Sequence, residues 1–272
     1  MTVYSRDLFA AFEEFWPLAG AEDWDAPGLI SGSLDRKISR VLLAVDVTSE
    51  IVDEAIDGGF DLVLAHHPYL LRGVKTLSEA TAKGALITRS IRAGVDLFAA
   101  HTNADVVADG ISAALAQALG VLEAEPLVLT GENVGHGRVG LLAEPTSLGD
   151  FARLVGAVLP STAQGIKVAG DYNMPVQRIA LCGGAGDSFI DAAVAADADV
   201  YLTSDLRHHP AQDARELALL NQQRPALIDV AHWAGEWIWL ESAASKLGQR
   251  FSDVQFVVSH IRTDPWDFVV TQ

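Results

Sequence analysis

The sequence predicts an α/β fold made of two related lobes. Three observations lead to this prediction: a strand–helix–strand pattern occurs twice, the copies lie a constant distance apart, and each copy continues into a strand that ends in His. The chain has 272 residues and half of them are apolar, which is enough to build a packed core in each of two lobes.

The first copy of the pattern is residues 40–64. A buried apolar strand is followed by a turn rich in Asp, Thr and Ser, then by an amphipathic helix and a second apolar strand. Residues 178–202 repeat this βαβ pattern at an offset of 138. Six positions are identical between the copies, namely Arg40, Leu43, Asp53, Ala55, Asp61 and Leu64 with Arg178, Leu181, Asp191, Ala193, Asp199 and Leu202.

Each copy then continues with a helical segment and a strand that ends in His, followed four residues later by an acid. The pairs are His101 with Asp105 and His232 with Glu236, and both precede a helix rich in Ala and Leu. We infer an internal duplication with an N-terminal α/β lobe over residues 1–125 and a C-terminal α/β lobe over 126–272. Residues of about 126–177 carry Gly, Pro and the short β-like runs GRVGLLAE and GIKVAG, and are predicted to be an elaboration of the second lobe.

The composition argues against several classes of partner. The formal net charge is −17 and no basic run occurs, so we do not expect nucleic acid to be a partner. Cys182 is the only cysteine, which excludes an internal disulfide and thiolate-rich metal sites. Neither a signal peptide nor an apolar stretch long enough to span a bilayer is evident, so we expect a cytoplasmic protein without a membrane partner.

Two adjacent histidines follow the second apolar strand of the first copy. His66 and His67 come directly after DLVLA, and Pro68 then stops the strand. Ligands of open α/β sheets bind at the carboxyl ends of the strands. A backbone turn at this end allows both imidazoles to address one site, although they would point to opposite faces within a strand.

Imidazole and carboxylate groups together are typical ligands of Zn, Fe, Mn, Co or Ni, and without thiolates the sequence does not choose among these metals. The His-x-x-x-acid spacing brings a nitrogen and an oxygen ligand within one turn of each other. If the strand ends of the two lobes converge, five side chains supply enough ligands for two divalent transition-metal ions, with one carboxylate bridging them. These are His66, His67, Asp105, His232 and Glu236.

The other histidines are weaker candidates. His208 and His209 lie beyond the strand end of the second copy, and two interpretations stay open: they line the cavity, or they lie in a solvated turn. His136 and His260 have no acid at a useful spacing and are interpreted as structural.

Other chemistries find less support. The run CGGAGDS has Phe189 where a dinucleotide-binding fingerprint needs Gly, and no Lys follows, so we interpret it as a tight strand-to-helix turn. Cys182 has no nearby His, and no G-x-S-x-G motif occurs, which argues against nucleophilic catalysis. The tryptophans beside the second His-x-x-x-acid pair are interpreted as an apolar wall, with stacking on a substrate as the alternative; they are Trp233, Trp237 and Trp239.

These motifs occur together and in the same order in a known family. The chain resembles the NGG-interacting-factor-three-like family, whose members are often labelled GTP cyclohydrolase I type 2 homologues. The resemblance spans nearly the whole chain, and its motifs are WDAPGLISG, AVDVTSEIVDEAI, LAHHPYL, AAHTNAD, GGAGDSFIDAA, DVYLTSDLRHHPAQDA and DVAHWAGEW. It implies a two-lobed α/β protein with a dinuclear metal site between the lobes, assembled as a ring-shaped homohexamer.

The resemblance also implies a role for each matching residue. His66 and Asp105 would bind one ion, His67 and His232 the other, and Glu236 would bridge the two ions. His101 would lie beside the ions, as a polar neighbour of the ligands or as a catalytic proton carrier. The sequence departs from the family pattern at WDAPG, at TSD and at Trp233, which leaves the ligands intact and puts substrate preference in question.

The implied function is a metal-dependent hydrolase that uses a metal-activated water on a small-molecule substrate. No residues identify a guanine pocket, so the sequence does not name the substrate. The alternative is a non-catalytic metal-dependent regulatory or scaffold protein that forms a ring oligomer.

Overall fold

The computed structural model describes residues 2–271, which form two compact units. Unit 1 contains residues up to 107 together with 240–263, and unit 2 contains residues 108–239 together with those from 264 onward. These compact units have other bounds than the predicted lobes 1–125 and 126–272, because the chain returns to unit 1 near its end. Whether the duplication itself divides at residue 125 stays a prediction.

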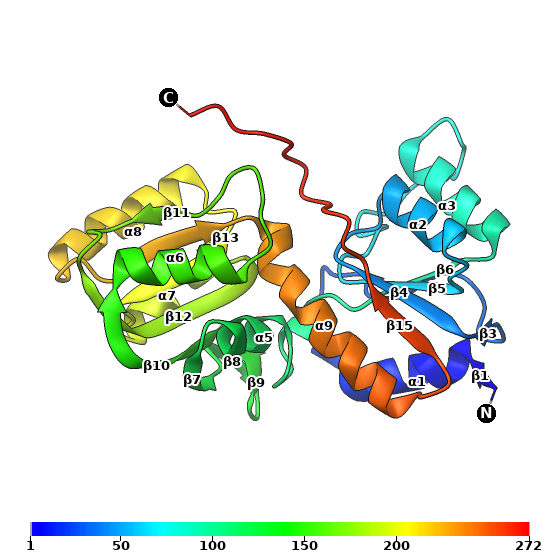
Figure 1. The fold of residues 1–272 in the computed structure, drawn as a ribbon, viewed down its shortest axis with the longest axis horizontal. Helices are drawn as coiled ribbons and strands as arrows, with labels where there is room; N and C mark the ends of the chain where they lie inside the picture. The colour runs from blue at the N-terminus through cyan, green and yellow to red at the C-terminus, as the bar shows by residue number, and fades with distance from the viewer. Residues whose placement is uncertain (1, 272) are drawn as a thin grey trace. The chain divides into compact units, whose positions relative to one another are not determined.

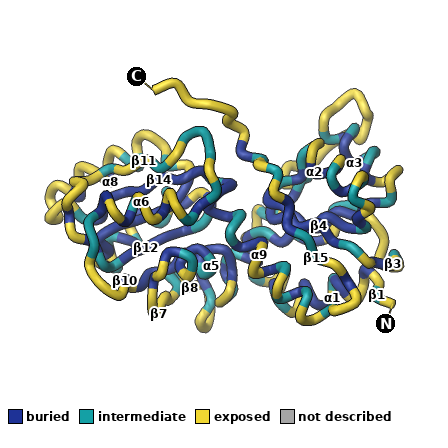
Figure 2. Tube along the Cα trace, in the orientation of Figure 1, coloured by how far each residue is buried: buried dark blue, intermediate teal, exposed yellow. Residues whose placement is uncertain are grey.

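Unit 1 is built around a five-stranded sheet (Figure 1). Its strands, in spatial order, are β15 (Gln255–Val258), β4 (Arg40–Ala44), β5 (Leu62–Ala65), β6 (Asp96–Ala99) and β2 (Gly28–Ser31). The first four strands run parallel and β2 is antiparallel to β6. The three strands β4, β5 and β6 are almost entirely buried, as their apolar sequences predict (Figure 2).

Helices cover both faces of this sheet. On one face, α2 (Ser49–Asp57) and α3 (Ala82–Ala93) bury Ile51, Val52, Leu86 and Ile87 against alternate strand residues. On the other face, Phe9 of α1 (Ser5–Phe15) stacks on Phe98 of β6 at 4.9 Å between ring centroids. Full burial of an Ile, Leu, Val or Phe side chain contributes about 1.5–3 kcal/mol to the free energy of folding. The smaller elements of unit 1 are β1 (Val3–Tyr4), β3 (Lys37–Ile38), the 3-10 helix η1 (Leu18–Gly20) and α4 (Thr102–Asp105).

Unit 2 is built around a six-stranded mixed sheet. Its spatial order is β11 (Lys167–Ala169), β14 (Ala226–Val230), β13 (Val200–Ser204), β12 (Pro175–Ala185), β10 (Arg138–Ser147) and β7 (Val121–Glu125). The strands β12, β13 and β14 are parallel. The predicted β-like runs GRVGLLAE and GIKVAG supply β10 and β11, so the elaborating segment extends this sheet at both sides.

The helices of unit 2 pack on this sheet, with α7 (Ile190–Ala195) and α8 (His208–Leu220) sharing a buried cluster with β12 and β13. The remaining elements are α5 (Ile111–Ala118), β8 (Val128–Gly131), β9 (Val134–His136), α6 (Leu148–Val158), η2 (Asp187–Phe189) and α9 (His232–Arg250). The first eight residues of α9 belong to unit 2, and the rest of this helix belongs to unit 1. The run CGGAGDS lies where β12 ends and η2 begins, so it forms the strand-to-helix turn that the sequence predicts.

The duplication is visible in the hydrogen bonds of the parallel strands of both sheets. The Asp61 carboxylate accepts from the backbone N–H groups of residues 39–40, at 2.7 and 3.0 Å, and the Asp199 carboxylate accepts from those of residues 177–178, at 2.8 Å each. All of these positions keep the offset of 138 found in the sequence. The strand registers keep it too, with Val41 opposite Leu62 in unit 1 and Ile179 opposite Val200 in unit 2.

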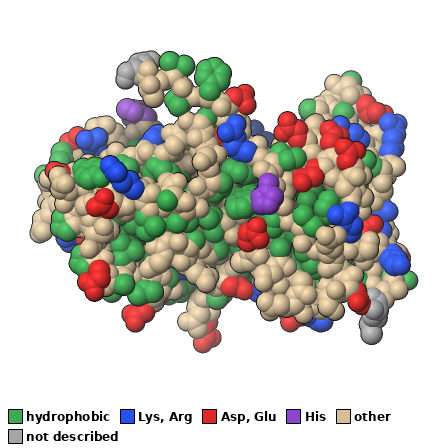
Figure 3. Space-filling view, viewed as in Figure 1, with side chains coloured by type: hydrophobic (Ala, Val, Ile, Leu, Met, Phe, Trp, Pro, Cys, Tyr) green, Lys and Arg blue, Asp and Glu red, His purple; other side chains and the backbone are tan. Residues whose placement is uncertain are grey.

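Across residues 2–271, no helix is both long enough and apolar enough to cross a membrane. On the face that Figure 3 shows, Lys and Arg side chains are scattered among Asp and Glu side chains.

Candidate metal centre

The two adjacent histidines lie at the carboxyl end of β5, where the sequence places them. The backbone N–H of His66 donates to Ala44 O at 3.0 Å, and that of His67 donates to Val45 O at 2.8 Å. The pairing with β4 therefore continues for two residues past the end of β5 before Pro68 stops it. Both imidazoles are held by an ordered backbone.

His101 joins them from the neighbouring strand β6. It is the residue before α4, and its backbone is neither helical nor extended, with φ −111° and ψ −115°. One ring nitrogen each of His66, His67 and His101 lies within 4.8 Å of the other two. Unit 1 therefore holds a group of three histidines that could hold a metal ion.

The Nδ1 atoms of His66 and His67 each contact an oxygen. His66 Nδ1 lies 2.9 Å from Ala100 O, and His67 Nδ1 lies 2.7 Å from the Asp46 carboxylate. A carbonyl or carboxylate oxygen accepts a hydrogen bond, so Nδ1 carries the hydrogen and the neutral ring has its lone pair on Nε2. This arrangement prepares both rings to bind a cation through Nε2.

His101 is held in the same way by Asp25. The two side chains meet at 2.7 Å between Nδ1 and Oδ1, while the other Asp25 oxygen accepts from the Thr102 hydroxyl at 2.5 Å and from its N–H at 3.1 Å. Burial acts to raise the pKa of Asp25, but the hydrogen bonds and the charge of His101 outweigh it and lower the pKa to about 2. Asp25 is therefore a fixed anion behind His101.

Asp105 is the acidic member of this group. It is the last residue of α4, and one of its carboxylate oxygens lies 3.9 Å from Nε2 of His66, which follows β5. That distance is too long for a hydrogen bond, but two ligands of one transition-metal ion can be this far apart.

Unit 2 brings His232 and Glu236 together on the first turn of α9. His232 Nε2 lies 2.9 Å from Glu236 Oε1, and His232 Nδ1 lies 2.8 Å from Asp205 Oδ2. Burial acts to lower the pKa of His232, but Glu236 and Asp205 outweigh it and raise the pKa well above its ordinary value. Without a metal, the two carboxylates on either side of this ring favour its protonated form.

Gly184 makes room for this pair. Its φ is +74°, and a Cβ at this position would lie 2.7 Å from Glu236 Oε1 and 3.5 Å from His232 Nε2. A residue with a side chain would therefore push against Glu236, would be in ordinary contact with His232, and would also strain the backbone.

The donors in each unit, taken separately, are of the kind that binds a divalent transition-metal ion. In each of four histidines an oxygen holds Nδ1, and three of these oxygens belong to carboxylates. Carboxylate–histidine pairs of this kind orient metal ligands in proteins and raise their basicity. The remaining donors are carboxylates, which complete a nitrogen and oxygen set suited to the metals that the sequence predicts.

The two His-x-x-x-acid pairs are not structural equivalents, contrary to the simplest reading of the repeat. Asp96 of β6 pairs with the first residue of β5, and Ala226 of β14 pairs with the first residue of β13, so Asp96 and Ala226 are equivalent positions. Counting five residues on from each makes His101 the equivalent of Ala231 and not of His232. His101 precedes its helix, whereas His232 is the first residue of α9. The one-residue difference places His232 where it contacts Glu236, four residues along the same helix.

Three carboxylates that hold the histidines could not be identified from the sequence. Asp25, Asp46 and Asp205 lie within the motifs WDAPG, AVDVTS and TSD, but nothing in the spacing links them to a particular His. For Asp205 the repeat offers a clue, because it lies 138 residues after His67, at the same strand end.

The other histidines lie elsewhere. His208 and His209 begin α8, are exposed, and contact each other at 5.2 Å between ring centroids. His136 stacks on Phe189 at 5.4 Å.

The sequence comparisons identify the family. The family model described as Duf34/NIF3 (NGG1p interacting factor 3) matches residues 3–265. The chain belongs to this family. A Streptomyces coelicolor relative named "GTP cyclohydrolase 1 type 2 homolog" is 42% identical over 268 residues, covering 96% of this chain and 92% of the relative. A Mycobacterium leprae relative of the same name is 32% identical over 376 aligned positions, covering 98% of this chain and 96% of the relative.

Solved structures agree with this assignment. A Bacillus cereus protein related to NIF3 superposes with a TM-score of 0.91 at 25% identity, covering 99% of this chain and 100% of the other. A hypothetical protein from Staphylococcus aureus superposes with a TM-score of 0.89 at 27% identity over the same shares. The NIF3 fold is therefore common to this chain and to both structures.

Proposed function

We propose that this NIF3-family protein is a dinuclear metal-dependent hydrolase that acts on a small-molecule substrate. His66 and Asp105 would hold one ion, His67 and His232 the other, and Glu236 would bridge them. The native metals would come from Zn, Fe, Mn, Co and Ni. The relatives' name "GTP cyclohydrolase 1 type 2 homolog" is consistent with hydrolysis, and we leave the substrate unassigned.

The observation that supports this proposal most strongly is that an oxygen holds Nδ1 in each of four histidines, His66, His67, His101 and His232. A buried histidine of any role usually has a hydrogen-bond partner, so the support comes from the use of the same nitrogen, Nδ1, in all four rings. Four rings held through the same nitrogen, three of them by carboxylates, are typical of metal ligands and their close neighbours.

The metal ions and the side chains around them would have different roles in hydrolysis. Two divalent ions would supply a water of lowered pKa and would polarise the bond that this water attacks. His101, whose ring hydrogen points to the Asp25 anion, could accept a proton at Nε2 and keep the resulting charge stabilised. Asp46 and Asp205 would keep His67 and His232 oriented while the substrate binds and leaves.

A hydrolase screen on the purified full-length protein tests the proposal. Esters, amides, phosphate esters and cyclic amidines should be offered to the metal-loaded protein, to the chelator-treated protein and to Glu236→Gln. Turnover that is lost on chelation, restored by metal and lost in Glu236→Gln is the expected result.

Glu241→Gln is the matched control, because Glu241 lies on the same helix but is exposed. It should keep full turnover. Tight metal binding and a metal-dependent assembly without turnover of any substrate would contradict the hydrolase and favour the regulatory or scaffold alternative.

A further inference from the structure

Unit 1 contains a cavity that the metal centre does not use. Its volume is about 570 Å³, and it lies between the start of α2, the face of α3 and the residues after the two histidines. This volume falls within the range of small-molecule sites in proteins. Its lining residues are Val47, Thr48, Ser49, Tyr69, Glu79, Ala82, Ala85, Leu86, Arg89 and Arg92.

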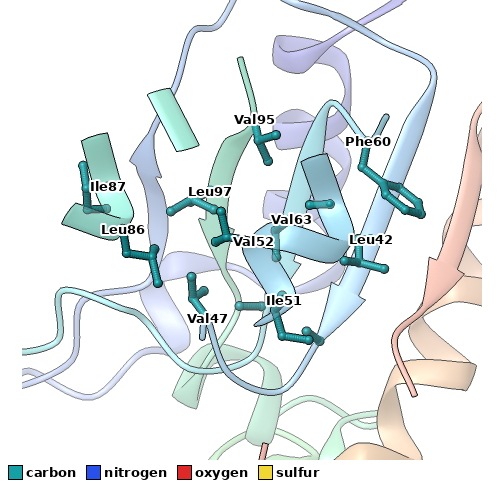
Figure 4. Close-up of a cluster of buried hydrophobic side chains, with 13 residues drawn as sticks. Leu42, Val47, Ile51, Val52, Phe60, Val63, Leu86, Ile87, Val95 and Leu97 are labelled. Atoms are coloured by element: carbon teal, nitrogen blue, oxygen red, sulfur yellow. The ribbon is translucent and has the colours of Figure 1, made fainter. Parts of the chain in front are cut away.

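The apolar part of the cavity belongs to the core of unit 1. Val47 and Leu86, both labelled in Figure 4, are members of the buried cluster between the sheet and its helices. Their side chains also line the cavity. The inner wall is therefore rigid and apolar, and it suits a ring or a short carbon chain.

Arg89 supplies a polar donor to this cavity. One terminal nitrogen donates to Ser49 O at 2.9 Å, and the other lies 3.1 Å from Asp53 Oδ1. These contacts fix the guanidinium plane. Its Nε is buried and has no hydrogen-bond partner within residues 2–271, so this N–H is the kind of donor that a ligand would satisfy.

Arg92 supplies a second cation, three residues further along the same helix. It pairs with Glu79 at 2.8 Å, and both side chains are more than half exposed. An exposed ion pair of this kind is weak, so a doubly charged anion can compete for the guanidinium. The lining contains two guanidinium groups and one carboxylate, and the carboxylate that pairs with Arg89, Asp53, lies outside the lining.

The start of α2 also favours an anion. Thr48 caps α2, where its side chain accepts from Ile51 N at 3.3 Å, so the positive end of the nine-residue helix borders the cavity. Tyr69 is a neutral part of the wall, because burial raises the pKa of its hydroxyl against the opposing effect of Arg89, and this hydroxyl donates to Ala82 O at 3.3 Å.

We propose that this cavity binds a small phosphate ester, with Arg89 and Arg92 contacting the phosphate and with Val47 and Leu86 contacting the organic part. A phosphate is favoured over a carboxylate because the two guanidiniums offer more donors than one carboxylate can accept. The cavity is a binding site in its own right and does not depend on the proposed hydrolase activity.

Phenyl phosphate is a suitable probe, because it joins a phosphate to one apolar ring. Binding to the full-length protein as purified can be followed by protein-observed NMR, with phenol and inorganic phosphate as partial probes. Phenyl phosphate should bind more tightly than either partial probe and should shift signals of α3. Arg92→Gln should weaken it by about tenfold, the loss expected for one charge-assisted hydrogen bond.

Glu79→Gln should act in the opposite direction, because it removes the only carboxylate in the lining and frees Arg92. The matched control is Arg6→Gln, since Arg6 also forms an exposed ion pair in unit 1, with Asp35, but lies outside the cavity. It should bind phenyl phosphate as the unchanged protein does.

Glu236→Gln separates this site from the metal centre. It should leave phenyl phosphate binding unchanged even where it abolishes turnover. The proposal is overturned if phenyl phosphate does not bind, if Arg92→Gln and Arg6→Gln weaken it equally, or if Glu236→Gln removes the binding.

Discussion

Gly184→Ala tests whether Glu236 needs the position that the structure gives it. Gly184 has φ +74°, so any other residue pays a backbone cost of about 1–2 kcal/mol there. The new Cβ would also lie 2.7 Å from Glu236 Oε1. Glu236 has a flexible side chain, and it can relieve this contact by moving away.

The required movement is large for a metal ligand. Ordinary contact begins near 3.4 Å, so the oxygen must move by about 0.7 Å, whereas metal–ligand distances are held to about ±0.2 Å. We therefore expect Gly184→Ala to lower metal affinity by at least about tenfold. The free energy of unfolding should fall by no more than the backbone cost of about 1–2 kcal/mol.

Gly120→Ala is the matched control, because Gly120 has nearly the same φ, +71°, and a Cβ there would meet nothing within 4 Å. Both variants should lose similar stability in urea unfolding of the metal-free protein. Only Gly184→Ala should lose affinity in titrations with Zn²⁺ against a competing chelator. Equal zinc affinities in the two variants would refute the role given to Glu236.

Three further predictions concern the ligands, pH and assembly. Glu236→Gln should weaken the binding of both metal ions, and His67→Ala should chiefly lose one of them. His101→Ala should lower metal affinity only by about 10–100-fold. Elemental analysis of the three variants measures this, and two tightly bound ions in Glu236→Gln would contradict the assignment. In the metal-free protein, burial lowers the pKa of His232, but Glu236 and Asp205 outweigh burial and raise it. The charged ring therefore stabilises the fold fully below its ordinary pKa of 6.5, and this stabilisation is lost as pH rises through the raised pKa of the folded protein. Thermal unfolding of chelator-treated protein should show this loss above pH 6.5, and the same loss in His232→Gln would contradict the assignment. Light scattering should give a mass several times the 29.0 kDa of one chain, with the hexamer as the expected state, and a stable monomer at micromolar concentration would contradict it.

Much of the fold could be predicted from local patterns in the sequence. Apolar runs such as residues 41–44 and 62–65 become buried parallel strands, and Thr48 marks the start of α2 with a side-chain cap. The repeat offset of 138 also recurs in the strand registers, because equal spacing of strand, helix and strand gives equal pairing. The bounds of the compact units could not be predicted, since they depend on the return of the chain from residue 240 to unit 1.

The candidate site could be predicted only in part. His66 and His67 were identifiable because a strand ends directly before them, and the end of a parallel strand is a known binding position. Their partners were not, since Asp46 lies 21 residues before His67 and reaches it only through the pairing of β4 with β5. Asp25 lies 76 residues from His101, and no local pattern connects them.

Metal content is the most direct test of the central claim that this chain is a dinuclear metal protein. The protein should be purified without chelators, supplemented with Zn, Fe, Mn, Co or Ni in turn, desalted, and measured by elemental analysis against amino-acid concentration. We predict close to two transition-metal ions per chain for at least one of these metals. A content near zero with every metal would contradict the claim.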